Sequence, residues 1–112
     1  MVPVLDRSLE HSARPVNWRG RSGRYYALAP RRIEDFVFAG EELYLVALGN
    51  HVMWAGSARN VVEDAVSRAR FRLAMECGDR VFHVESGVDE VERMTIVWDL
   101  EGAEPAMGLS AA

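Results

Sequence analysis

The sequence predicts an α+β domain: a small mixed or antiparallel sheet with one main helix, residues 60–77, packed on one face. Two patterns predict it. A continuous apolar run over residues 43–48 is followed by a two-residue turn and a second apolar run, as in a β-hairpin. Residues 60–77 repeat apolar side chains at helical period and are followed by a glycine. A chain of 112 residues, 49% hydrophobic, suits one domain.

The hairpin is indicated by its residue types. Residues 43–48 are all apolar, which predicts a strand buried on both faces. Gly49 and Asn50 tolerate the positive φ angles of a tight turn, so residues 51–55 are expected to return as the partner strand.

The main helix is predicted from its ends and its stripe. Asn60 with Glu63 three places later resembles a capping box, and Gly78 marks the end. The apolar positions 62, 65, 66, 69, 73 and 77 form one stripe, which we expect to pack on the sheet with Cys77 buried. Val66→Asp is then expected to cost more than about 3 kcal/mol.

The remaining elements are short. We expect strands in residues 24–29 and 80–85, a short helix over 30–37, a helical turn in 88–93 and a last strand over 94–98. The predicted sheet combines residues 43–55, 81–85 and 94–98. Residues 1–20 are expected to form a flexible basic arm, residues 21–100 a single α+β domain, and residues 101–112 a frayed tail that can be removed from about Ala106.

Charge is distributed unevenly along the chain. The net charge is -4, and all 13 basic residues are arginine. Seven of them fall in the first 32 residues against two acids, whereas the remainder carries six against 15. This asymmetry fits a nucleic-acid-binding arm, an arm folded on its own acidic body, or a coding preference for arginine. The sequence leaves these three open.

One basic segment interleaves guanidinium groups with aromatic rings. Trp18, Arg19, Arg21 and Arg24 are the candidate nucleic-acid-binding residues, because arginine contacts phosphates and aromatic rings stack on bases. The alternative is that Trp18 and the neighbouring tyrosines enter the core and the arginines stay in water.

Tyr44-Leu45-Val46, the hairpin and the step Trp54-Ala55-Gly56-Ser57 resemble a degenerate core of the GIY-YIG nuclease family, over residues 43–85. The resemblance implies a metal-dependent phosphodiesterase with a pocket around Tyr44, Trp54 and Arg59. Trp54 stands where the family has its second tyrosine. Val62-Glu63-Asp64 stands where the family presents an arginine to the phosphate, so the residues for catalysis are incomplete.

No catalytic residues, metal site or cofactor are predicted. The histidines His11, His51 and His83 and the single Cys77 lack zinc-site spacing, and no nucleophile–base set or phosphate loop can be assembled. The leading hypothesis is therefore a non-enzymatic binding or regulatory module acting on a protein partner. A nucleic-acid-binding accessory protein is the alternative, and a phosphodiesterase the third.

The expected compartment is the cytoplasm. The lone cysteine suits a reducing environment, and the sequence lacks both a signal peptide pattern and an apolar run long enough for a membrane span. The identity of the partner and the oligomeric state are left open.

Overall fold

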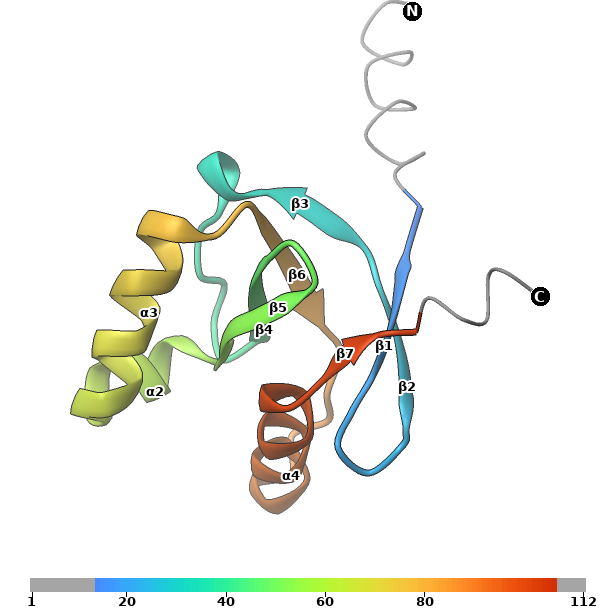
Figure 1. The fold of residues 1–112 in the computed structure, drawn as a ribbon. Coiled ribbons are helices and arrows are strands. Elements are labelled where there is room, and N and C mark those ends of the chain that lie inside the picture. Colours follow the sequence, from blue (N-terminus) through green and yellow to red (C-terminus); the bar gives the residue numbers. More distant parts are fainter. Residues whose placement is uncertain (1–13, 107–112) are drawn as a thin grey trace, which may run out of the picture.

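The chain folds into two antiparallel sheets joined by helices, which confirms the α+β class (Figure 1). The computed structural model describes residues 14–106. The three-stranded sheet has the order β2-β1-β7 and comprises β1 (Val16–Arg19), β2 (Tyr25–Leu28) and β7 (Glu104–Pro105). The four-stranded sheet has the order β3-β6-β4-β5 and comprises β3 (Pro30–Arg32), β4 (Leu43–Leu48), β5 (His51–Gly56) and β6 (Arg80–Val84).

Helices cover both faces of the four-stranded sheet. On one face lie α2 (Ala58–Glu63), α3 (Ala65–Cys77) and the 3-10 turn η1 (Ile33–Asp35), packed on Tyr44, Val46 and Trp54. On the other face, α4 (Glu90–Glu101) and the three-stranded sheet pack on Leu45 and Phe82. Strand β4 is therefore buried on both sides, as its continuous apolar run predicts.

The predicted hairpin is confirmed as β4 and β5. Gly49 takes φ 58° at the turn. The register shifts between Val46 and Ala47, and Met53 is the extra residue of the resulting bulge. Met53 and Trp54 consequently belong to the same side of the sheet, where α3 lies.

The predicted helix over 60–77 is in fact two helices. Asp64 is extended (φ -121°, ψ 115°), and its carboxylate accepts hydrogen bonds from the backbone N of Val66 (2.9 Å) and Ser67 (3.2 Å). It thereby acts as the N-cap of α3 and interrupts the helix before it. Helix α2 starts earlier than expected, where the Asn60 side chain accepts from the backbone N of Ser57 at 2.8 Å.

The expected burial of the helical stripe is wrong. Val66 is 63% exposed and Leu73 53%, and Cys77 is exposed as well. The buried face instead carries Phe71 and Ala74. The periodicity identifies side chains that share one face of α3. The opposite face turns toward the sheet, because it carries the Phe71 ring, which packs beside Trp54.

The predicted strand over 94–98 is also wrong, because these residues lie within α4. Asp89 precedes the helix, and Glu90 and Glu92 place negative charge in its first turn, where the helix dipole favours it. Ile96 and Leu100 are buried four residues apart. A five-residue apolar alternation does not distinguish this helical face from a strand. Similarly, residues 30–37 form β3 and a single 3-10 turn.

Part of the predicted arm and tail belongs to the fold. Strand β1 pairs with β2 and with β7, so residues 16–19 and 104–105 are in the three-stranded sheet. Trp18 is fully buried and Ala103 is buried beside it in the same core cluster. The rest of the predicted arm up to residue 13, and the tail from residue 107, lie outside the described residues.

Candidate functional site

Helix α3 has a second apolar surface, opposite the one in the core. Its members are spaced three and four residues apart and stay exposed to solvent. This surface, the α3 face, consists of Val66, Ala69 and Leu73 on α3. A surface helix ordinarily turns polar residues to water on this side, so this apolar strip is the candidate site.

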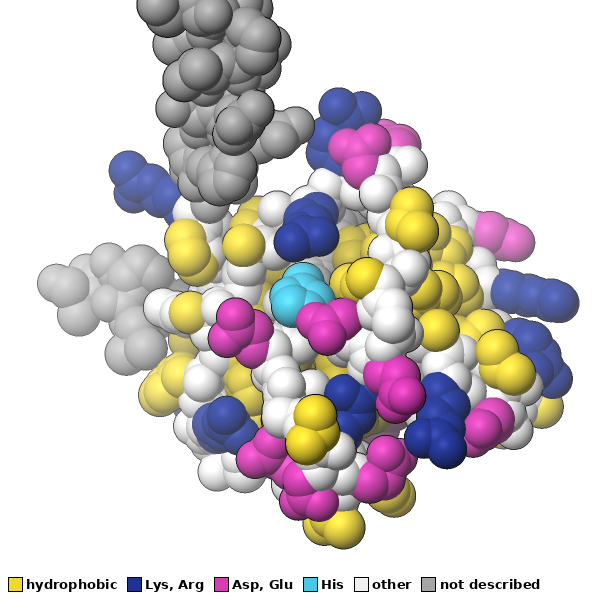
Figure 2. All heavy atoms as spheres, turned by 180° about the vertical axis from the view of Figure 1, so that it is seen from behind, with side chains coloured by type: hydrophobic (Ala, Val, Ile, Leu, Met, Phe, Trp, Pro, Cys, Tyr) yellow, Lys and Arg dark blue, Asp and Glu magenta, His cyan; other side chains and the backbone are white. Residues whose placement is uncertain are grey.

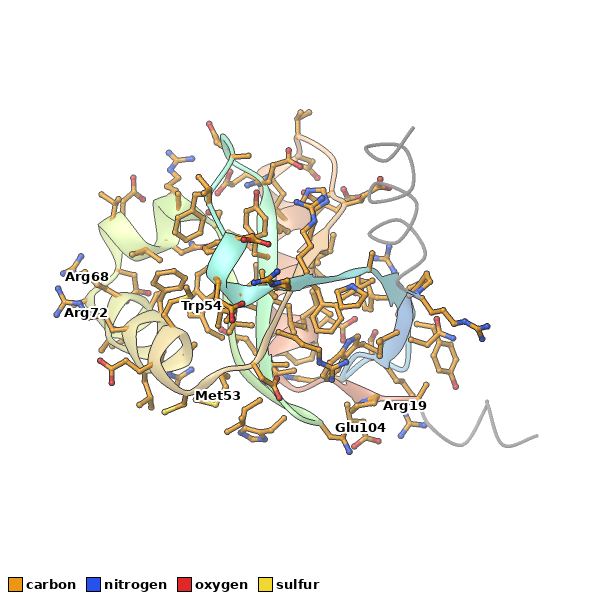
Figure 3. The ribbon with its side chains drawn as sticks, turned by 90° about the horizontal axis from the view of Figure 1, so that it is seen from above. Arg19, Met53, Trp54, Arg68, Arg72 and Glu104 are labelled. Atoms are coloured by element: carbon orange, nitrogen blue, oxygen red, sulfur yellow. The ribbon has the colours of Figure 1, made fainter. Side chains whose placement is uncertain are left out.

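Two arginines flank the α3 face. Arg70 and Arg72 lie on either side of it, because consecutive helical residues are about 100° apart, and the exposed Glu76 lies on the Arg72 side. Among residues 14–106, neither arginine has an ion-pair or hydrogen-bond partner. Arg68, by contrast, donates to the carbonyl oxygens of Val61 and Val62, both at 3.0 Å. Figure 3 shows Arg72 projecting from the outer side of α3, away from Trp54.

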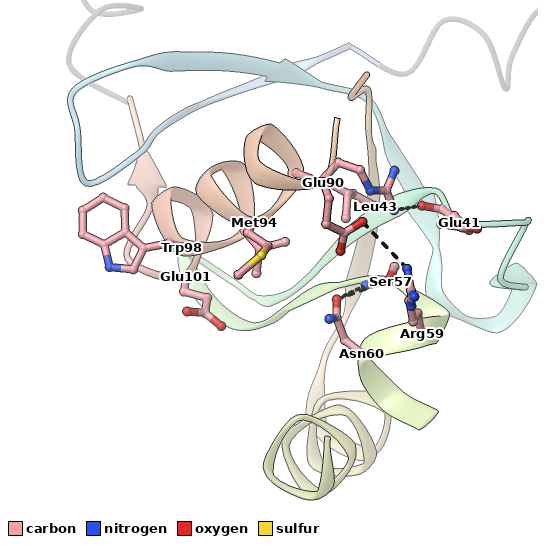
Figure 4. Close-up of a pocket in the computed structure, with 11 residues that line it drawn as sticks. Glu41, Leu43, Ser57, Arg59, Asn60, Glu90, Met94, Trp98 and Glu101 are labelled. Atoms are coloured by element: carbon pink, nitrogen blue, oxygen red, sulfur yellow. Dashed lines mark hydrogen bonds and ion pairs between the residues drawn. The ribbon is translucent and has the colours of Figure 1, made fainter. Parts of the chain in front are cut away.

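Helix α4 carries a similar apolar surface among acidic residues. The α4 face consists of Val91 (70% exposed), Met94 (64%) and Trp98 (53%). Exposed carboxylates border it, from Glu90, Glu92 and Glu101. Two cations lie beside it as well, since Arg59 pairs with Glu90 at 3.7 Å and Arg21 lies 5.1 Å from the Trp98 ring. Figure 4 shows Met94, Trp98 and Glu101 on α4, across a hollow from Arg59 and Asn60 of α2.

The edge strand β5 separates the two helices. Within residues 14–106, β5 pairs only with β4 and is the last strand of its sheet. Arg70 and Leu73 of α3 and Glu101 of α4 line one hollow with His51 and Met53 of this strand. The apolar surfaces of α3 and α4 therefore border the same open edge of the molecule.

The predicted pocket residues do not share a cavity. Tyr44 is buried, and its hydroxyl accepts from the backbone N of Ala39 at 3.1 Å. Trp54 donates from Nε1 to Ser67 Oγ at 2.9 Å. Arg59 lies elsewhere, in ion pairs with Glu63 (3.3 Å) and Glu90 (3.7 Å). Each of the three lines a different hollow.

The candidate nucleic-acid residues contact other residues of the same protein. Arg19 pairs with Glu104 at 2.5 Å (Figure 3). Arg21 donates from Nε to the Trp98 carbonyl oxygen at 2.9 Å and stacks 5.1 Å from that ring, and Arg24 stacks 4.7 Å from the Tyr26 ring. With Trp18 buried, its ring is not accessible for base stacking. On the face that Figure 2 shows, basic and acidic side chains are interspersed.

A buried carboxylate fixes the loop between β1 and β2 to α4. Asp99 accepts hydrogen bonds from the Ser22 backbone N (2.7 Å), the Ser22 hydroxyl (2.8 Å) and the Tyr26 hydroxyl (2.7 Å). Burial alone would raise the pKa of the Asp99 carboxyl, but these hydrogen bonds outweigh it and hold the pKa below its usual range. The pKa of Tyr26 rises to about 12 through burial and then through its bond to Asp99. Gly20 packs directly on this carboxylate, where a Cβ would come within 2.5 Å of it.

A histidine–carboxylate pair involves β6, an inner strand of the four-stranded sheet. His83 Nε2 is hydrogen bonded to Glu42 Oε1, and its ring lies 5.5 Å from that of Tyr44. Arg31 lines the same shallow hollow. The sequence does not predict the contact between Glu42 and His83, because the two residues are 41 positions apart.

Among the described residues, no group of three histidine, cysteine or acidic side chains is placed to hold a metal ion. None of the described helices is both long and apolar enough to cross a membrane. No family model, curated protein or solved structure matches this chain. The resemblance of residues 43–85 to GIY-YIG nucleases therefore stays a prediction.

Proposed function

We propose that this protein is a non-enzymatic protein-interaction module that binds its partner through the α3 face. The exposed apolar strip of Val66, Ala69 and Leu73 carries this proposal. Covering a valine or leucine side chain with a partner is worth roughly 1.5–3 kcal/mol. Burial of Val66 and Leu73 is therefore worth roughly 3–6 kcal/mol, which offsets part of the cost of association.

The flanking arginines define the chemistry of the partner. Arg70 and Arg72 present two guanidinium groups beside the apolar strip. A partner with an apolar strip bordered by carboxylates matches both features. Charge pairs at the rim of such an interface contribute mainly to partner choice and to the association rate.

A catalytic role has less support. The residues that the nuclease resemblance would use are occupied elsewhere: the Tyr44 hydroxyl and the Trp54 indole are in internal hydrogen bonds, and Arg59 is in ion pairs. The proposal therefore rests on surface chemistry.

Site-specific photo-crosslinking in cells tests the proposal. A photoreactive phenylalanine replaces Val66, and the matched control replaces Tyr25, which is half exposed on β2. Figure 1 places β2 and α3 at opposite ends of the molecule. We expect a discrete adduct at position 66, reduced by the double substitution Arg70→Glu and Arg72→Glu, and none at position 25. Absence of any adduct at 66, or equal adducts at both positions, contradicts the proposal.

A further inference from the structure

The α3 face and the α4 face are complementary in charge as well as alike in apolar character. Arg70, Arg72 and the exposed Glu76 border the first. Glu90, Glu92 and Glu101 border the second, where Arg59 pairs with Glu90 and Arg21 lies over the Trp98 ring. The excess charge is thus positive beside the α3 face and negative beside the α4 face, so that each would select the other in a partner.

The two surfaces also match in length and spacing. Leu73 lies seven positions after Val66 on α3, and Trp98 lies seven positions after Val91 on α4, which is about 10 Å of helix in both cases. Both place apolar side chains three and four residues apart, the spacing by which two helices interlock along a seam. One apolar strip can therefore cover the other along its whole length.

Within one molecule these surfaces do not meet. Helix α3 packs on one face of the four-stranded sheet and α4 on the other, with β5 at the edge between them. Contact between an α3 face and an α4 face therefore requires two copies of the chain. Arg70, Leu73 and Glu101 border one hollow at that edge, so a single approaching copy reaches both helices from the same side.

We propose that the partner is a second copy of this chain, bound so that the α3 face of each copy covers the α4 face of the other. The proposal rests on the proposed function and names the occupant of its binding surface. A two-fold axis repeats the α3–α4 contact twice and closes the assembly as a dimer. Pairing of α3 with α3 would instead set arginines beside arginines, and pairing of α4 with α4 would set carboxylates beside carboxylates, which is unfavourable.

Two variants of opposite charge test this arrangement by complementation. Leu73→Glu places a carboxylate where the acidic α4 of the second copy would bind, and Met94→Arg places a cation where the basic α3 would bind. Both side chains are more than half exposed, so both variants are expected to fold, as circular dichroism and the melting temperature will verify. Tyr25→Glu, on distant β2, is the matched control.

Sedimentation equilibrium of the full chain gives the readout. We expect wild type and Tyr25→Glu to dimerise with a dissociation constant of about 1–100 µM. Each of the two α-helix variants alone is expected to weaken self-association at least about tenfold. An equimolar mixture of them should regain dimers, because one contact is then intact and the other pairs the new glutamate with the new arginine.

Other outcomes overturn the inference. If the wild type is monomeric over about 1–100 µM, the inference is wrong. It is also wrong if the Leu73→Glu and Met94→Arg variants each still dimerise, or if their equimolar mixture forms no dimer. The crosslinking experiment separates this failure from failure of the proposed function. An adduct at position 66 to a different protein leaves the interaction module standing, whereas no adduct ends both.

Discussion

Asp99 is a buried acidic residue with several hydrogen-bond donors around its carboxylate. Its carboxylate is buried and accepts three hydrogen bonds from a loop 77 residues away and from Tyr26. Asp99→Asn keeps the size but replaces an acceptor oxygen with an NH2 group that faces donors. We expect a loss of about 1.5–3 kcal/mol in the free energy of unfolding, measured in urea. The exposed neighbour Glu101→Gln is the control, and an unchanged midpoint for Asp99→Asn would falsify this role.

The same cluster predicts how stability depends on pH. The Asp99 pKa is held below its unfolded value of about 3.9, so its contribution is full above that pH and is lost as pH falls through the lower folded value. The Tyr26 pKa is raised to about 12, so its contribution is full below about pH 10 and is lost as pH rises toward 12. The melting temperature should therefore fall at both extremes, and less steeply in Asp99→Asn. Identical pH profiles for the two proteins would exclude this assignment.

Helix α3 presents two apolar surfaces, and substitutions distinguish them. Val66→Asp lies on the exposed α3 face and should change the unfolding free energy by no more than about 0.5 kcal/mol. Phe71→Asp would replace a partly buried ring with a charge beside Phe36, Phe38 and Trp54 and should cost at least about 2 kcal/mol. Denaturation at a concentration too low for self-association checks both. An equal loss of unfolding free energy in the two variants, or a larger loss for Val66→Asp, would show that Val66 packs on the sheet, as the periodicity alone predicts.

Elements defined by local rules could be predicted from the sequence. The hairpin of β4 and β5, strand β6 and strand β2 follow from apolar runs bounded by turn residues. The orientation of α3 could not, because it depends on contacts distant in sequence. Phe71 meets Phe36 and Phe38 of the segment before β4, and Ser67 accepts from Trp54. Those contacts select the inward surface of a helix that is apolar on both sides.

The sequence shows the residues of the candidate site but predicts them to be core. Val66, Ala69 and Leu73 belong to one predicted stripe, and helical period alone does not say whether a stripe faces the sheet or a partner. Met94 and Trp98 fall in the strand predicted over 94–98, so the sequence does not indicate the helical surface that they share. The placement of the α3 face and the α4 face beside the same edge strand, β5, depends on the tertiary fold and could not be predicted from the sequence.

At the scale of the whole molecule, the basic N-terminal region does not act as an independent arm over the described residues. Arg19, Arg21 and Arg24 bind internal partners. Replacing all three with alanine should therefore lower stability, and both proteins should bind short single-stranded DNA and RNA equally and negligibly at low and high salt. Binding by the wild type that falls steeply with salt and is lost in the triple variant would instead support nucleic-acid recognition, by roughly one unit of slope per arginine.

The contact between the α3 face and the α4 face of a second copy is tested most directly by a spin label on the native Cys77, which is exposed at the end of α3. Labelled protein is mixed with an isotope-enriched Cys77→Ser copy, so that only contacts between molecules broaden the observed resonances. We predict broadening of the amides over residues 91–98, with those of β2 unaffected. Broadening confined to α3, or none in a sample that sediments as a dimer, would contradict the arrangement.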